Sequence, residues 1–190
     1  RGYQVGGKSL LWARWVQRWS DLDFEANAKE GVGVDWPIRY KDIEPWYSYV
    51  EKFVGVSGTK EGISHLPDGE FLPPMELNCV EQHFKNQLQK SHPGRHYIIS
   101  RTANLTEAQE VHKKLGRGNC QYRDRCSTGC PFGGYFSTNS STLPAARATA
   151  PSNASRPSAS EVSVLTGKPV ASASALVNAD QCFLTLWDEA

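Results

Sequence analysis

The sequence predicts a chain of mixed helix and strand that folds up to about residue 147. Two stretches place apolar residues at helical spacing, and a short run suited to a strand follows them. After Ala146 the composition changes: residues 147–179 are mainly Ala, Ser, Pro, Thr and Val, without an aromatic residue. Such a stretch buries too little apolar surface to offset the entropy of ordering it. At 190 residues the chain is long enough for one sizeable core, or for one domain plus an appendage.

The first stretch with regular spacing is SLLWARWVQRW, at residues 9–19. Its tryptophans Trp12, Trp15 and Trp19 are three and four residues apart. This is helical spacing, so it favours packing in the core over an exposed stacking surface.

The first long helix is expected at residues 42–54. Its apolar side chains recur on one face: Trp46, Val50, Phe53 and Val54. Pro45 is expected in the first turn, where its missing N–H costs little, and Gly55 is a C-terminal stop.

A second long helix is expected at residues 76–90, after a loop rich in glycine and proline. Its apolar face consists of Leu77, Val80, Phe84 and Leu88. Pro93 and Gly94 end it, and HYIIS at residues 96–100 is the candidate strand.

The N-terminal residues 2–9, GYQVGGKS, match the phosphate-loop pattern G-x-x-x-x-G-K-[ST]. A phosphate loop follows a buried strand, opens a helix, and needs an acidic residue that helps to hold magnesium. Only Arg1 precedes this pattern, and the nearest acidic candidate is Asp180 in the tail. A P-loop NTPase therefore stays an alternative function.

Three of the five cysteines crowd into one short loop, with the spacing C-x5-C-x3-C-P. They are Cys120, Cys126 and Cys130. Thiolates on such a loop can bind a three-iron cluster, one ligand for each iron, and a proline often follows the last cysteine of an iron–sulfur site. Structural zinc usually has paired cysteines and a fourth ligand, which here would be Cys79 or His112. A zinc or cluster-binding module without enzyme activity, or a disulfide plus a free thiol, are the alternatives.

Charge and hydropathy exclude some classes of function. The formal net charge is +1, so nothing points to nucleic acid, and no run of 18 apolar residues predicts a transmembrane segment. Three arginines flank the cysteines and are expected to be solvated charges, with tuning of a cluster or docking of an acidic acceptor as the alternative: Arg117, Arg123 and Arg125.

Four stretches together resemble the glucose–methanol–choline (GMC) family of flavin oxidoreductases, and most of all its membrane-associated bacterial sugar dehydrogenases and gluconate-dehydrogenase-like flavoprotein subunits. They are VGGKSLLWA, DWPIRYKDIEPWYSYVEKFVGVSG, the cysteine loop, and FSTNSSTLPAA. The likeness covers residues 1–147, a partial GMC oxidoreductase. The low-complexity tail, residues 148–190, is expected to be disordered or out of frame.

The resemblance implies an α/β fold: a parallel FAD-binding domain plus a substrate domain with an antiparallel sheet, present here as an incomplete internal fragment. It implies that five residues lie against FAD: Gly6, Gly7, Ser9, Trp12 and Ala13. The family's dinucleotide glycines would precede Arg1, and its catalytic His would follow residue 190. None of the five His here lies in a matching motif, so each is expected at the surface or in a loop.

The activity that the resemblance implies is a dehydrogenase that oxidises CH–OH groups of sugars, polyols or sugar acids. Hydride would pass to FAD, and electrons would leave through a 3Fe-4S cluster on Cys120, Cys126 and Cys130. The acceptor would be a cytochrome c subunit or a quinone, and the location periplasmic or at the inner membrane. The fragment alone is expected to be inactive.

Overall fold

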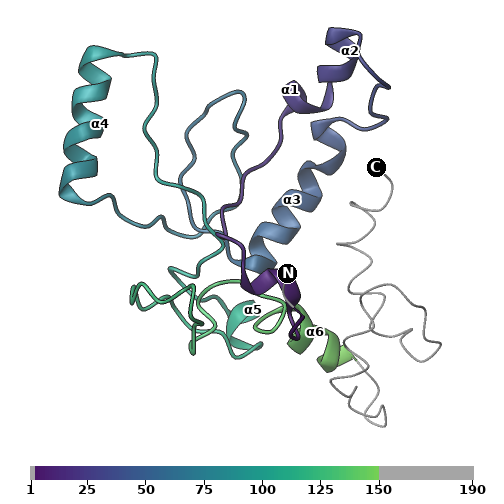
Figure 1. Cartoon of the computed structure of the whole chain (residues 1–190), viewed down its shortest axis with the longest axis vertical. Coiled ribbons are helices and arrows are strands. Elements are labelled where there is room, and N and C mark those ends of the chain that lie inside the picture. Colours follow the sequence, from purple (N-terminus) through teal and green to yellow (C-terminus); the bar gives the residue numbers. More distant parts are fainter. Residues whose placement is uncertain (1–2, 150–190) are drawn as a thin grey trace.

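The computed structural model describes residues 3–149 of the chain. The helical elements in this range are η1 (Gly7–Leu10, a 3-10 helix), α1 (Asp21–Phe24), α2 (Ala26–Glu30), α3 (Tyr40–Val54), α4 (Cys79–Ser91), α5 (Glu110–Lys113) and α6 (Thr142–Thr149). Figure 1 shows α3 running from α1 and α2 down to a base of loops, with α4 on a separate arm. Apart from α1 and α2, the described helices hardly pack on one another.

The base consists of short extended segments that pair with one another through isolated bridges rather than in continuous strands. The segments lie at residues 14–16, 56–58, 72, 101–105 and 134–136. Residues 101–105 are central: the backbones of Ser57 and Thr102 exchange two hydrogen bonds, of 2.8 and 3.0 Å. On the opposite edge, Ala103 donates to Arg14 O at 2.8 Å and accepts from the Phe136 N–H at 2.8 Å. Within residues 3–149 the pairing stays at isolated bridges, so the α/β class remains a prediction.

The strand expected at residues 96–100 is wrong. These residues are irregular, and pairing begins only at Arg101 and Thr102. Residues 92–100 lead back from the α4 arm, and among the described residues the backbone of residues 96–100 makes no hydrogen bond to another segment. The β-branched run therefore lacks the partner that a strand requires.

The helix expected at residues 42–54 is confirmed as α3, which begins two residues earlier. Asp42 accepts from the Arg39 N–H at 2.8 Å, and this reciprocal cap sets the start at Tyr40. Pro45 is therefore the sixth helical residue, so Lys41 O lacks its usual i+4 donor. Gly55 ends the helix at φ +78°, where an L side chain would be strained.

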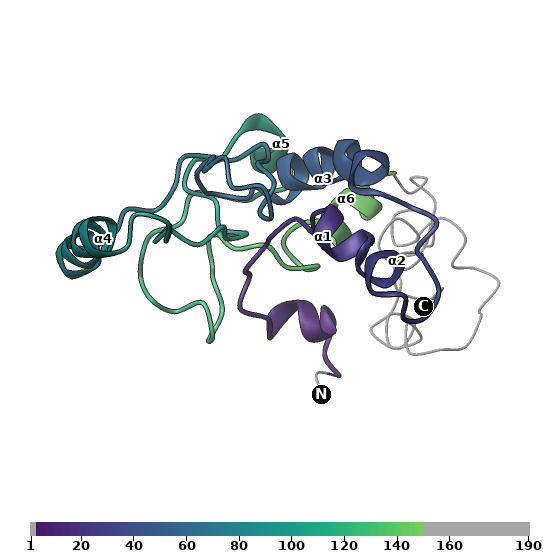
Figure 2. The same ribbon diagram turned by 90° about the horizontal axis from the view of Figure 1, so that it is seen from above.

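The second expected helix is confirmed as α4, shifted to later residues. Asn78 accepts from the backbone N–H groups of Val80 and Glu81, each at 3.0 Å, so the helix starts after it. No α4 residue is buried, and on the predicted apolar face the Phe84 ring packs on that of Tyr97, with centroids 5.1 Å apart. Figures 1 and 2 both show α4 apart from every other helix.

The tryptophan series is not helical, and the core packing predicted for it is confirmed for Trp12 but wrong for Trp15 and Trp19. After η1 no helix forms before Asp21, and buried and exposed side chains alternate with a period of two, although Arg14 has a left-handed φ of +66°. Arg14, Arg18 and Ser20 are buried on one side. Trp15 and Trp19 point outward and are 70% and 52% exposed.

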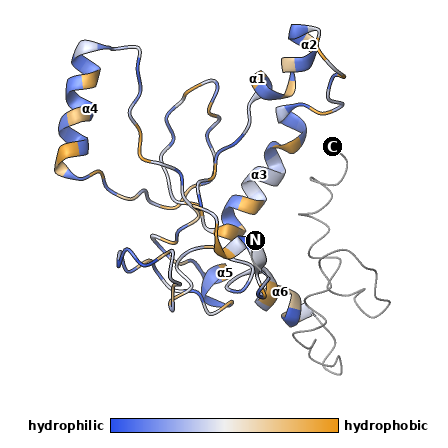
Figure 3. Ribbon diagram, in the orientation of Figure 1, coloured by the Kyte–Doolittle hydropathy of each residue, from blue (hydrophilic) through white to orange (hydrophobic). Residues whose placement is uncertain are grey.

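The core is small and contains nearly as many polar as apolar residues. Its main cluster consists of Val54, Val56, Ala103 and Phe136, packed by Trp12, Val16, Val50, Phe53 and Phe71. A second cluster contains Leu72, Leu105 and Ala108. Figure 3 shows apolar residues gathered at the C-terminal end of α3, where it meets the base. Within residues 3–149, no helix combines the length and apolar character that a membrane crossing requires.

The predicted boundary at residue 147 falls inside α6, which continues to Thr149. The remainder of the predicted tail, residues 150–190, lies outside the described residues.

Candidate functional site

A glycine turn at residues 5–9 forms the first candidate site. Gly6 and Gly7 have φ +98° and +46°, a left-handed conformation that L side chains rarely adopt. The Gly7 N–H donates to Gln4 O at 2.9 Å, and the Ser9 N–H donates to Gly6 O at 3.0 Å. Gly6 and Gly7 are half-buried and carry no Cβ, so a flat ligand could approach their backbone closely.

A segment from the far end of the described chain holds this turn. The Thr138 N–H donates to Ser9 Oγ at 3.0 Å, and Asn139 Nδ2 donates to Val5 O at 2.9 Å. A Cβ on Gly6 would lie 2.9 Å from Asn139 Oδ1. Ser9 Oγ also donates to Gly6 O at 2.5 Å, so its hydroxyl is used within the protein.

Thr138 and Asn139 were missed as site residues by sequence reasoning. Their motif, FSTNSSTLPAA, indicated only a return toward the flavin domain. The structure brings three of the five predicted cofactor residues together in the turn: Gly6, Gly7 and Ser9.

The other two predicted cofactor residues, Trp12 and Ala13, lie apart from each other. The Trp12 ring packs against the core, edge-on to Phe136 with ring centroids 6.2 Å apart. Its indole N–H is buried without a partner among the described residues. Ala13 is exposed on the opposite side of the extended segment.

The surroundings of the turn do not match a phosphate loop. A four-residue 3-10 helix and then an extended segment follow Lys8, where a phosphate loop would open an α-helix. Lys8 is exposed. Gly2 and the acidic candidate Asp180 lie outside the described residues.

The cysteine loop forms the second candidate site. Cys120, Cys126 and Cys130 are half-buried free thiols. The Cys120 N–H anchors the loop to Leu105 O at 2.6 Å, and the Gly134 N–H points to Cys130 Sγ at 3.4 Å. Over residues 3–149, no three Cys, His, Asp or Glu side chains are arranged to hold a metal ion, so these sulfurs are not gathered at one point.

The three thiols nevertheless lie close enough to influence one another. Burial raises the pKa of Cys126 above its usual value; the Arg14 guanidinium opposes this, and Cys120 and Cys130 add to it. Arg14 NH2 also donates to Cys126 O at 3.3 Å.

The prediction that all three arginines around the cysteines are solvated is wrong for Arg117. It is 2% exposed, whereas Arg123 and Arg125 are exposed as predicted. Its NH1 donates to Val54 O at 2.8 Å and its Nε to Gly133 O at 3.0 Å. Burial lowers the pKa of Arg117 to about 10, and nearby Cys130 offsets part of this.

Neither Cys79 nor His112 is placed to act as a fourth zinc ligand at the cysteine loop. Cys79 is exposed at the start of α4, on the separate arm. His112 is fully buried in α5, contrary to the expected surface or loop position. Its Nδ1 accepts from the Gln109 N–H at 3.1 Å, and its Nε2 donates to Lys52 O at 2.9 Å. The other four His are exposed, as predicted.

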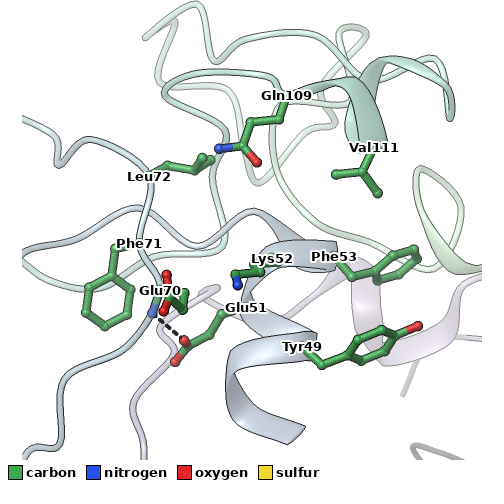
Figure 4. Close-up of a pocket in the computed structure, with 9 residues that line it drawn as sticks. All are labelled: Tyr49, Glu51, Lys52, Phe53, Glu70, Phe71, Leu72, Gln109 and Val111. Carbon is green, nitrogen blue, oxygen red and sulfur yellow. Dashed lines mark hydrogen bonds between the residues drawn. The ribbon is translucent and has the colours of Figure 1, made fainter. Parts of the chain in front are cut away.

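A depression of about 440 Å³ beside α3 contains none of the predicted site residues (Figure 4). Its lining residues are Tyr49, Glu51, Lys52, Phe53, Glu70, Phe71, Leu72, Gln109 and Val111. Its buried acid, Glu51, accepts from Arg18 at 2.7 Å and from the Glu70 N–H at 2.8 Å. Because these bonds occupy the carboxylate, Glu51 is not a free acid or base.

Two curated proteins are similar in sequence to the chain. A 2-methyl-1,2-propanediol dehydrogenase from Mycolicibacterium austroafricanum is 28% identical over 111 residues, 56% of the chain and 20% of that protein. The fructose dehydrogenase large subunit from Gluconobacter japonicus is 24% identical over 136 residues, 70% of the chain and 24% of that protein. The matches thus span about a fifth to a quarter of these relatives' length. No family model matches the chain.

Proposed function

We propose that the chain is part of an FAD-dependent oxidoreductase of the GMC type, a dehydrogenase. The whole enzyme oxidises CH–OH groups of sugars, polyols or sugar acids and passes hydride to FAD. Electrons then leave through an iron–sulfur cluster on Cys120, Cys126 and Cys130 to a cytochrome c subunit or a quinone. The similarity to two dehydrogenases supports the class of reaction.

The observation that carries the flavin proposal is the glycine turn clamped by Thr138 and Asn139. Two sequence motifs more than 120 residues apart, both quoted for the family resemblance, lie against each other. FAD, when bound, supplies the hydride acceptor. The backbone of Gly6 and Gly7 would face the cofactor, while Ser9 would position the turn, because its hydroxyl bonds Gly6 O and the Thr138 N–H.

The chemistry of the cysteine loop fits a thiolate-bound cluster. It supplies three free thiols, a backbone N–H aimed at Cys130 Sγ, and two buried guanidinium groups with orphaned nitrogens, on Arg14 and Arg117. The sulfurs would have to move closer together to hold one cluster. A bound cluster supplies one-electron transfer.

Flavin retention in the full protein that contains this chain tests the proposal. Gly6→Ala puts a Cβ at φ +98° against Asn139, and the strain of about 1–3 kcal/mol corresponds to a loss of roughly five- to 150-fold in FAD affinity. Gly31→Ala is the matched control, because Gly31 also has a left-handed φ of +66° but nothing within 4 Å. FAD per protein is measured by absorbance after gel filtration.

Undiminished flavin in the Gly6→Ala protein would show that the turn does not contact the cofactor. A wild-type protein that lacks flavin but binds ATP with magnesium would replace the proposal with the P-loop NTPase. Reduction of a dye acceptor by a panel of sugars, polyols and sugar acids tests the class of substrate.

A further inference from the structure

Four arginines are buried in the described chain, and two of them have carboxylate partners. Arg18 pairs with Glu51 at 2.7 Å, and Arg101 pairs with Asp68 at 2.9 Å. The other two, Arg14 and Arg117, have no acidic partner within residues 3–149.

Both arginines without a carboxylate lie beside the cysteine loop. Arg117, 2% exposed, bonds the carbonyl of Gly133, three residues after Cys130. Arg14, 6% exposed, bonds the carbonyl of Cys126 and lies 3.7 Å from the ring centroid of Tyr135. Arg117 lies three residues before Cys120 in the sequence, whereas Arg14 reaches the loop from the N-terminal segment.

Each of these side chains also keeps a buried nitrogen without a partner. Arg117 NH2 and Arg14 Nε are both shielded from solvent, and no described atom accepts from them. Arg101 Nε is also without an acceptor among the described residues, but Arg101 has the Asp68 carboxylate to balance its charge. A buried charge is stable only when an opposite charge and hydrogen bonds compensate it. The missing compensation therefore points to an anion at the cysteine loop.

We propose that Arg14 and Arg117 are the buried countercharges of an anionic, thiolate-bound centre held by Cys120, Cys126 and Cys130. The inference rests on the cluster in the proposed function and adds the residues that set its electrostatics. A disulfide or neutral thiols would carry no charge for them to balance. Net charge and hydrogen bonds around sulfur govern the reduction potential of such centres, so these two arginines stabilise the reduced, more negative form.

The experiment uses the full protein, purified without oxygen, with its iron and sulfide measured. Its reduction potential is followed by EPR during titration with dithionite, in the wild type, Arg117→Met and Arg14→Met. Each neutral variant is expected to shift the reduction equilibrium about tenfold toward the oxidised form, or ~59 mV for a one-electron couple. Arg117→Lys keeps the positive charge, so its reduction potential is expected to stay close to the wild-type value.

Arg125→Met is the matched control, because it removes the same charge from an exposed position in the same loop. Its potential is expected to stay at the wild-type value, since solvent screens an exposed charge. If Arg117→Met does not fold, Arg14→Met and Arg117→Lys carry the test. An intact cluster whose potential is unchanged in Arg14→Met and Arg117→Met overturns the inference and leaves the proposed function standing.

If the wild-type protein holds no iron, the cluster in the proposed function fails, and cadmium becomes the probe. The thiolate-to-cadmium charge-transfer absorbance of the reduced protein then gives the affinity of the loop. An affinity about tenfold lower in Arg14→Met and Arg117→Met, but not in Arg125→Met, supports the countercharge role. Equal affinities in all four proteins overturn it.

Discussion

At the scale of single residues, Glu51 connects three segments through its carboxylate. Both oxygens accept from Arg18, at 2.8 and 2.7 Å, and one also accepts from the Glu70 N–H. Arg18 further donates to Tyr40 OH at 2.8 Å. A Cβ on Gly69 would lie 2.4 Å from Glu51 Oε2, so only glycine fits beside the pair.

Glu51→Gln is expected to destabilise the chain strongly, because it leaves the Arg18 charge buried without compensation. Breaking a buried ion pair costs about 3–5 kcal/mol. Urea unfolding measures this loss. Glu110→Gln, which breaks the exposed pair with Lys113, is the control and should cost no more than about 0.5 kcal/mol. Similar losses in the two variants would contradict the prediction.

His112 is the second residue that predicts a measurable effect, a dependence of stability on pH. Burial lowers its pKa below 6.5, nearby Arg117 lowers it further, and the bond to Lys52 O opposes both. The unfolded chain therefore binds a proton more readily than the folded one. The contribution is fully present above about pH 6.5 and is lost as the pH falls through the lowered pKa.

The free energy of unfolding between pH 7.5 and 5, measured with urea, checks this sign. We expect His112→Gln to flatten the decline with acid, even though it lowers stability overall. His83→Gln, at an exposed position, should keep the wild-type slope. An equally steep decline in His112→Gln would show that other groups cause it.

At the scale of elements, α4 depends on its own cap. At its start, the Asn78 side chain accepts from the Glu81 N–H at 3.0 Å and the Glu81 side chain accepts from the Asn78 N–H at 2.8 Å, and no residue of the helix is buried. By contrast, α3 buries Glu51 and Val54 and ends at a glycine packed against Leu105 and His112. Local bonds thus hold α4, and tertiary contacts hold α3.

Asn78→Ala is expected to unfold α4 locally. The cap is worth about 0.5–2 kcal/mol, which is enough to raise hydrogen exchange at residues 79–91 several-fold. The urea midpoint of the remaining fold should change little, since no residue of α4 is buried and α4 packs on no other helix of the described chain. Gln89→Ala, at an exposed position in the last turn of the helix, is the control and should leave exchange slow. A lower global midpoint in Asn78→Ala would mean that α4 packs against the base.

At the scale of the whole molecule, α4 and the α1–α2 pair lie at opposite ends, with the paired segments between them (Figure 2). The described chain exposes many large apolar side chains, among them Trp15, Trp19, Trp46 and Tyr49. Scattered exposed apolar residues are normal, but several on neighbouring segments favour binding of apolar probes and self-association.

The double variant Trp15→Gln plus Trp19→Gln is expected to reduce binding of the dye ANS and self-association in sedimentation. Its urea midpoint should fall only slightly, because Trp15 is 70% exposed and Trp19, which packs on the rings of Phe24 and Trp36, is still 52% exposed. Trp12→Gln should instead lower the urea midpoint without reducing ANS binding. Trp12 packs on the main core cluster, and truncating a packed aromatic costs about 3–5 kcal/mol. Equal stability losses in the two proteins would contradict the alternation of buried and exposed residues.

The sequence by itself determined the two long helices, because their signals are local. Apolar spacing placed both; their starts moved to the caps at Arg39 and Asn78, and the end of the second helix moved by one residue. It also predicted which two regions carry the candidate sites, from the glycine pattern and the cysteine spacing.

Tertiary structure alone decided the rest, because burial of a polar group depends on partners from distant segments. Tryptophan spacing in residues 12–19 suggested a helix, yet pairing with residues 101–103 made the segment extended and turned its arginines inward. Thr138 and Asn139 joined the glycine turn through hydrogen bonds spanning more than 120 residues. Arg117 is buried because Val54 O and Gly133 O accept from it, and neither acceptor can be inferred from its neighbours in sequence.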